Sequence, residues 1–114
     1  MLERVPRRWP GDAAVRQDEG VSRVEVTAAV DGDGWDCSVT VRNGGETQHR
    51  VRVTRADLAR LAPGTSDPVG LVEASFAFLL EREPKESILR EFDLSVIGTY
   101  FPEYEREIGR RLAG

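Results

Sequence analysis

Apolar and polar residues alternate along three segments in the first half of the chain. The apolar members are Val24, Val26, Ala28 and Val30 in the first segment, Trp35, Cys37, Val39 and Val41 in the second, and His49, Val51 and Val53 in the third. A period of two is typical of strands that bury one face. Turn residues separate the segments, at positions 31–34 and around Gly44-Gly45. We therefore predict a three-stranded antiparallel meander.

The alternation also predicts the register of the strands. Pairing Val30 with Trp35 brings apolar positions of the first two strands opposite one another, so the first turn has an even-length loop. In the second hairpin, a two-residue loop at Gly44-Gly45 would place Val39 opposite Arg50. An odd-length loop is required instead, such as three residues with a glycine bulge. The outer face then carries Arg23, Thr27, Ser38, Thr40, Arg42, Arg50 and Arg52.

The period changes to that of a helix over residues 68–82. Asp67 can cap the first turn, and Pro68 suits the first helical position. At about 100° per residue, apolar side chains and Ser75 cover roughly two thirds of the circumference. Only Gly70, Glu73, Ala77 and Glu81 are left for water. Because such a helix must be covered on several sides, we expect it at the centre of the fold, with a core that includes Phe76, Phe78, Leu79, Ile88, Leu89 and Phe92.

Shorter helices are predicted on both sides of this central one. Thr54 begins a capping-box spacing with Asp57, which predicts a helix over residues 55–61. Residues 85–92 are predicted as a helix that follows Pro84 and turns Ile88, Leu89 and Phe92 inward. Pro102 should interrupt the chain before a last helix at 103–112, which carries Tyr104, Ile108 and Leu112 on one side. The predicted fold class is α+β, a three-stranded antiparallel meander with one face covered by C-terminal helices.

Three short motifs of the second half resemble a known group of proteins. They are FAFLLEREPKESIL at 76–89, FDLSVI at 92–97 and YFPEY at 100–104. Together they resemble a group of short, uncharacterised bacterial proteins. That group carries no agreed activity, so the resemblance implies a shared fold and transfers no site residues.

Length and composition limit the organisation of the chain. Its 114 residues suit a single α+β domain at 21–114 after a flexible arm at 1–20, which has no periodicity. The sequence contains no run of about 18 apolar residues, so no membrane span is predicted. The first residues are interrupted by charges and prolines, unlike a signal peptide. Cys37 is the only cysteine, so no internal disulfide can form and we expect a cytoplasmic location.

Few residues suggest catalysis or metal binding. Cys37 and His49 share a face, but Cys37 stands among strand valines and is typical of a small core residue. The turn at 31–36 resembles the start of a calcium loop, yet Trp35 occupies a ligand position. The carboxylates of the second half are expected to form a solvated helix surface. We expect no catalytic residue, metal ion or cofactor, and enzymatic activity is left open as the less favoured alternative.

The remaining hypothesis is a non-enzymatic module that binds another protein or itself. Net charge −4 disfavours a protein dominated by phosphate contacts. Three aromatics beside a proline, with a charged neighbour, give a candidate partner-binding site at Tyr100, Phe101, Glu103 and Tyr104, with Tyr104 or Phe101 partly exposed as an anchor. The favoured interpretation is that these rings only cover the central helix, because large aromatic side chains dominate cores. The alternative is nucleic-acid binding through the arm and the phosphate-contacting candidates Arg42, Arg50 and Arg52. No membrane contact is expected.

Overall fold

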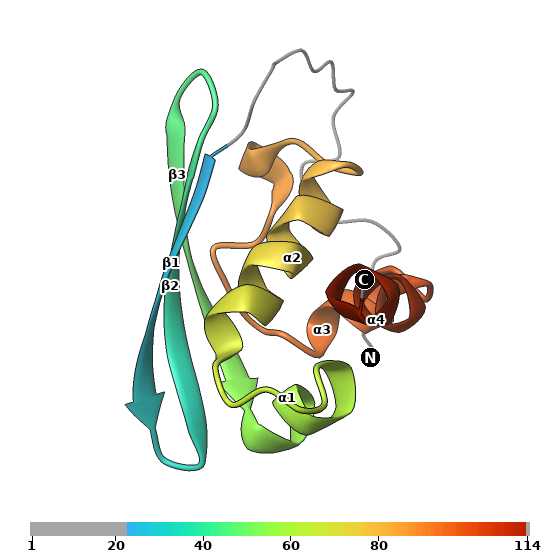
Figure 1. Cartoon of the computed structure of the whole chain (residues 1–114). Coiled ribbons are helices and arrows are strands. Elements are labelled where there is room, and N and C mark those ends of the chain that lie inside the picture. Colours follow the sequence, from blue (N-terminus) through green and yellow to red (C-terminus); the bar gives the residue numbers. More distant parts are fainter. Residues whose placement is uncertain (1–22, 114) are drawn as a thin grey trace, which may run out of the picture.

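The chain folds into one sheet covered on one face by helices, which confirms the predicted α+β class. The computed structural model describes residues 23–113, so the predicted arm at 1–20 lies outside the described residues. The elements are β1 (Arg23–Asp31), β2 (Gly34–Arg42), β3 (Glu46–Thr54), α1 (Arg55–Leu61), α2 (Pro68–Leu80), the short 3-10 helix η1 (Lys85–Ser87), β4 (Glu91–Asp93), α3 (Val96–Tyr100) and α4 (Tyr104–Ala113). Figure 1 shows the sheet edge-on, with every described helix on one side of it.

The register of the meander follows the predicted rule. Val30 lies opposite Trp35, and the loop between β1 and β2 has two residues, Gly32 and Asp33. In the second hairpin Arg42 lies opposite Glu46, so the loop has three residues, 43–45. The two glycines of that loop have φ values of 73° and 153°, which residues with a side chain rarely adopt. The odd length of this loop keeps the valines of β2 and β3 on the same buried face.

The predicted three-stranded antiparallel sheet is wrong in the number and direction of its strands. The sheet has four strands in the order β1-β2-β3-β4, and β4 runs parallel to β3. Consequently residues 85–92 are not a helix, since helical structure there is limited to η1. The N–H of Arg50 bonds to the C=O of Arg90 at 2.7 Å, and the N–H of Leu94 bonds to the C=O of Arg52 at 2.9 Å. The free edge of β3 stabilises these three residues as a strand, and this outweighs the helical spacing of their apolar side chains.

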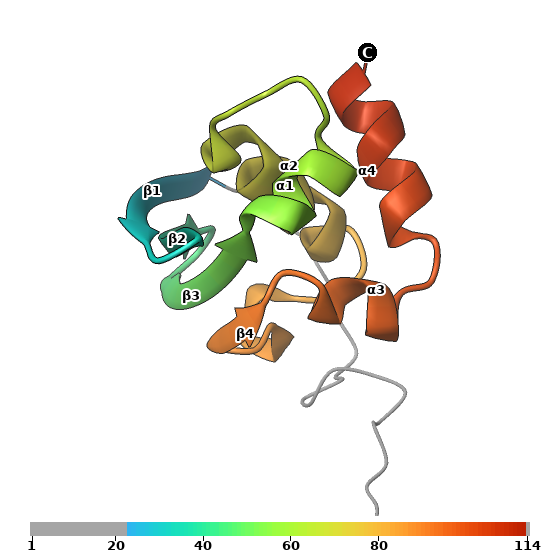
Figure 2. The same ribbon diagram turned by 90° about the horizontal axis from the view of Figure 1, so that it is seen from below.

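Helix α2 lies at the centre of the fold, as its periodicity predicts. The Asp67 carboxylate accepts from the N–H of Val69 at 2.9 Å, and the helix ends at Leu80 rather than at residue 82. Figure 2 shows α2 between the sheet and α4. The residues predicted to face water are all exposed: Gly70, Glu73, Ala77 and Glu81.

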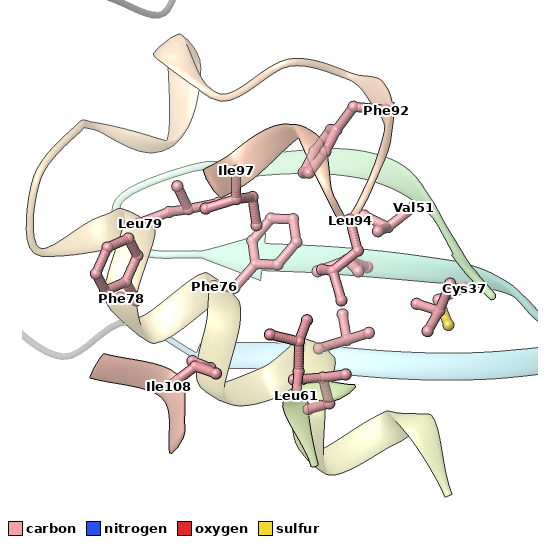
Figure 3. Close-up of a cluster of buried hydrophobic side chains, with 14 of the residues drawn as sticks. Cys37, Val51, Leu61, Phe76, Phe78, Leu79, Phe92, Leu94, Ile97 and Ile108 are labelled. Atoms are coloured by element: carbon pink, nitrogen blue, oxygen red, sulfur yellow. The ribbon is translucent and has the colours of Figure 1, made fainter. Parts of the chain in front are cut away.

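The core forms between α2, the inner face of the sheet and the C-terminal segment. Figure 3 shows Phe76 and Leu79 of α2 close to Leu94 and Ile97, with Phe92 and Val51 above and to the right of Phe76 in this view. Of the six predicted core residues, five are buried and Leu89 is half-buried. Aromatic rings of this size dominate the apolar area removed from water.

The helices predicted at 55–61 and 103–112 are present as α1 and as α4, which begins and ends one residue later than predicted. Thr54 and Asp57 form the reciprocal capping box of α1. The chain turns at Pro102 between α3 and α4, and α4 buries Tyr104 and Ile108 while Leu112 near its end stays 38% exposed. Within residues 23–113, none of the helices has the length and apolar character needed to cross a membrane.

Candidate interaction surface

The outer face of the sheet is a surface of alternating charges. Cross-strand rows run over it, and the two rows nearest the middle of β3 contain Thr27, Ser38, Arg50 and Glu91 in one and Ala29, Asp36, Arg52 and Asp93 in the next. None of the described helices lies over this face (Figure 1). Because side chains on neighbouring strands stand side by side, each arginine has a carboxylate within reach.

Three arginines predicted to contact phosphate are engaged by carboxylates. Nη1 of Arg52 lies 2.8 Å from Asp31, and Nη1 of Arg42 lies 2.9 Å from Glu25. Arg50 lies 3.6 Å from Asp36. Such exposed pairs add little stability, but they neutralise the guanidinium charges and orient the side chains.

The outer face as a whole therefore is not a basic surface. Its outward strand positions hold four arginines and six carboxylates, namely Arg23, Arg42, Arg50 and Arg52 against Glu25, Asp31, Asp36, Glu46, Glu91 and Asp93. The outer face, for which four arginines and no acidic residue were predicted, therefore carries more carboxylates than arginines. The carboxylates were not among the residues predicted for this face, although the period-two alternation that places the arginines there places the carboxylates of β1, β2 and β3 there as well.

A shallow open depression lies on this face beside β4. Its volume is about 330 Å³, and its lining consists of Asp31, Asp36, Arg50, Arg52, Glu91, Phe92 and Asp93. The depression exists because β4 adds a fourth strand to the sheet and supplies two of its carboxylates. Four carboxylates surround two guanidinium groups, so the depression favours cationic groups over anionic ones.

The predicted aromatic anchor is wrong for Tyr104, which is buried at 1% exposure. Its hydroxyl lies 2.6 Å from Oγ of Ser75, which itself donates to the C=O of Leu71 at 2.7 Å. Because the Ser75 proton is used in that bond, the Tyr104 hydroxyl is the donor to Ser75. Burial raises the pKa of the phenol well above its ordinary value. Helix packing, rather than partner binding, accounts for this ring.

The other predicted anchor residues also contact the core. Phe101 is half-buried with its ring edge-on to Phe78 at 5.8 Å, and Tyr100 is half-buried as well. Glu103 accepts from Nε of Arg82 at 3.1 Å. The guanidinium of Arg82 lies 3.8 Å from the centre of the Phe78 ring. Phe101 and Tyr100 are therefore the only two of the predicted aromatics that keep some surface for a partner.

Cys37 and His49 do not form a reactive pair. Both ring nitrogens of His49 are occupied, Nδ1 by the C=O of Leu89 and Nε2 by Oγ1 of Thr47, each at 2.9 Å. Cys37 is fully buried, and burial together with the negative charge of Asp36 raises the pKa of its thiol to about 11. A buried thiol of this kind stays protonated and unreactive. Across the described part of the chain, no three His, Cys, Asp or Glu side chains are grouped so as to hold a metal ion.

Lys85, the sole lysine of the chain, has a structural role that no sequence pattern indicates. Its side chain is buried, and Nζ donates to the C=O of Asn43 at 3.1 Å and to Glu86 at 2.8 Å. The hydrogen bond from Lys85 lowers the pKa of the Glu86 carboxyl. Lys85 thereby connects η1 to the loop between β2 and β3, a contact between residues 42 positions apart that no local pattern predicts.

Comparisons with known proteins give no relative for this chain. No known protein family matches it, and no curated protein and no solved structure is similar to it.

Proposed function

We propose that this protein is a non-enzymatic module that binds a partner protein on the outer face of its sheet, at the depression between β3 and β4. The observation that carries the proposal is the arrangement of Asp31, Asp36, Glu91 and Asp93 around Arg50 and Arg52 on an open sheet face. Charged groups of both signs at fixed spacings give specificity in protein contacts.

The chemistry of the described residues supports binding rather than catalysis. The thiol of Cys37 is buried with a raised pKa, and both nitrogens of His49 are engaged. A general base or nucleophile must reach a substrate within hydrogen-bond distance, and neither group has that access. The carboxylates of the depression stand at the surface beside arginines, where they suit recognition of a charged partner.

The same geometry favours a protein over nucleic acid as the partner. Phosphate binding requires cationic groups that are free to contact the backbone, and here Arg42 and Arg52 already bond to carboxylates at 2.9 and 2.8 Å. The excess of carboxylates over arginines would repel phosphates. The partner that fits is a protein segment with lysine or arginine side chains, which would enter among the carboxylates of the depression.

A charge reversal in the depression tests this proposal. The Glu91→Lys variant should retain the fold and lose a partner that the wild-type protein captures from its native cells, because it replaces an attraction by a repulsion. Glu73→Lys on the exposed side of α2 is the matched control and should still capture the partner. The captured protein is then purified, and its affinity for wild type should fall steeply with salt.

Two outcomes contradict the proposal. The first is a partner that binds Glu91→Lys and the wild-type protein equally well with purified components. The second is tight binding of duplex or single-stranded DNA or RNA with a steep salt slope, which would restore the nucleic-acid alternative.

A further inference from the structure

The strand β1 lies at the end of the sheet opposite β4, and no other described strand pairs with its free edge (Figure 2). It has nine residues in continuous register with β2 and therefore contains no bulge. It also contains no proline and no lysine. Natural proteins protect long edge strands with prolines, bulges and charged side chains. Of these devices β1 has only the outward charges of Arg23, Glu25 and Asp31, so its backbone edge is suited to pairing with another strand.

The backbone groups at this edge can be assigned from the hairpin. The two-residue loop closes on Asp31 and Gly34, and such a loop can only close on a pair that exchanges both backbone hydrogen bonds. Bonded and non-bonded pairs alternate along an antiparallel ladder. The odd-numbered residues of β1 therefore direct their N–H and C=O groups to β2. The even-numbered residues, from Val24 to Val30, direct theirs to the open edge.

The side chains of the same residues differ in how far the rest of the protein covers them. Val24, Val26 and Ala28 point to the helix layer and are half-buried, whereas Val30 at the end of β1 is 70% exposed. The outward residues at the two ends of β1 carry opposite charges, Arg23 and Asp31. A strand that is apolar on one face and oppositely charged at its ends is complementary to a reversed copy of itself.

We propose that the open edge of β1 pairs with β1 of a second copy of this chain, antiparallel and centred on Thr27. This register places Val24 opposite Val30 of the second copy and Arg23 opposite its Asp31. The exposed valine is then covered, and Arg23 brings a second guanidinium group to Asp31, which already bonds to Arg52 of its own chain. The two-fold axis is perpendicular to the sheet, so the helices of both copies lie on one side and the eight strands form one continuous sheet.

Other registers are less favourable. Side chains alternate with a period of two, and only the even-numbered residues direct their backbone groups to the open edge. An even-numbered residue can therefore pair only with an even-numbered residue of the second copy, so successive possible registers differ by two residues. Centring the pair on Glu25 places two identical carboxylates opposite one another, and centring it on Ala28 places Glu25 opposite Asp31. Centring it on Val26 leaves Val30 and Asp31 beyond the paired region. The register centred on Thr27 alone pairs all nine residues of β1.

This inference uses the backbone edge of β1, whereas the proposed partner site uses the outer face beside β4, and the two share only Asp31. If both hold, the dimer carries two copies of the depression on one continuous surface. Loss of self-pairing would leave the partner site intact, and loss of partner binding in Glu91→Lys would leave the dimer intact.

Disulfide trapping tests the register directly. At the axis the two copies of residue 27 form a non-hydrogen-bonded pair with Cα atoms about 4.5 Å apart, within the reach of a disulfide. Thr27→Cys should therefore yield a covalent dimer under mild oxidation. Glu25→Cys and Ala29→Cys are matched controls, since their copies would lie about 14 Å apart and should not crosslink. Native Cys37 is buried, and the wild-type chain measures any crosslinking that occurs through it.

Sedimentation of the non-covalent protein gives the second measurement. Wild type should be a dimer, and Thr27→Lys should weaken it about tenfold or more, because two ammonium groups would meet at the axis. Thr40→Lys lies one strand away from the edge on the same face and should dimerise like wild type. A wild-type chain that remains a monomer at about 100 µM overturns the proposal; a dissociation constant of that size corresponds to about 5.5 kcal/mol of association free energy. Equal crosslinking of all three cysteine variants overturns the register.

Discussion

The hydroxyl of Tyr104 donates a hydrogen bond of 2.6 Å to Oγ of Ser75, and both side chains are buried. The bond joins the first residue of α4 to the middle of α2, 29 positions earlier in the chain. The hydroxyl of Ser75 in turn donates a hydrogen bond to the C=O of Leu71 on α2. The last helix is therefore fixed on the central one by a polar chain inside an apolar core.

A double-mutant cycle measures this relationship. Ser75→Ala should lower the free energy of unfolding by about 1–3 kcal/mol, because it leaves the Tyr104 hydroxyl buried without a partner. Tyr104→Phe removes the donor and should cost about 1 kcal/mol. The double variant should be less destabilised than the sum of the two, with a coupling of at least about 0.5 kcal/mol. Additive losses in denaturant melts would mean that the bond contributes nothing to stability.

Removal of a core ring should be far more costly. Phe76→Ala and Phe92→Ala should each lower the free energy of unfolding by about 3–5 kcal/mol, because each leaves a cavity in the packed layer between α2 and the sheet. Thermal and denaturant melts measure the loss. Values below about 1 kcal/mol at both positions would contradict the central place of α2.

The stability of the protein should fall on mild acidification because of His49. Burial lowers the pKa of this imidazole from its ordinary value, although the bond to Leu89 opposes the shift. The unfolded chain therefore binds a proton more readily than the folded one below about pH 6.5. The His49 contribution is fully present above that pH and is lost as the pH falls towards the lower folded pKa. Unfolding free energies measured between about pH 7.5 and 5.5 should show this slope.

His49→Asn is the matched control for the pH effect. Its amide nitrogen can still donate towards Leu89, and it does not titrate. The variant should be less stable at neutral pH but should show a flatter slope in the same range. An unchanged slope would assign the effect to other groups.

Cys37 should react slowly with thiol reagents in the folded protein. The side chain is fully buried on the inner face of β2, and its thiol pKa is raised to about 11. The thiolate is the reactive form, so labelling at pH 8 should depend on unfolding. Labelling as fast as in denaturant would mean that the register of β2 and β3 is wrong.

Much of the fold could be predicted from local patterns. The positions of β1, β2 and β3, their register and the odd length of the second loop follow from which residues are apolar, because a shift of one residue would expose every valine. The central place of α2 follows from a helix whose apolar arc is too wide for one neighbour. The capping residues Thr54 and Asp67 mark helix starts through bonds that span only two or three residues.

The candidate site was predicted less completely. Arg50 and Arg52 were assigned to the correct face. Whether they can bind a phosphate depends on Asp36 and Asp31, which form ion pairs with them. Glu91 and Asp93 reach the depression only because β4 exists. Tyr104 was one of two candidates for an exposed anchor, and its burial follows from the way α4 packs on α2.

The sequence by itself determined the elements whose information is local: the three long strands with their register, the capped helices α1 and α2, and the faces that each buries. The tertiary structure alone decided the parallel strand β4, the hydrogen bond from Lys85 to the loop after β2, and the hydrogen bond between Tyr104 and Ser75. Each of these joins segments that lie far apart in the chain. A three-residue strand has too few hydrogen bonds to form alone, so it exists only where β3 offers a free edge, and no pattern within residues 91–93 can encode that edge.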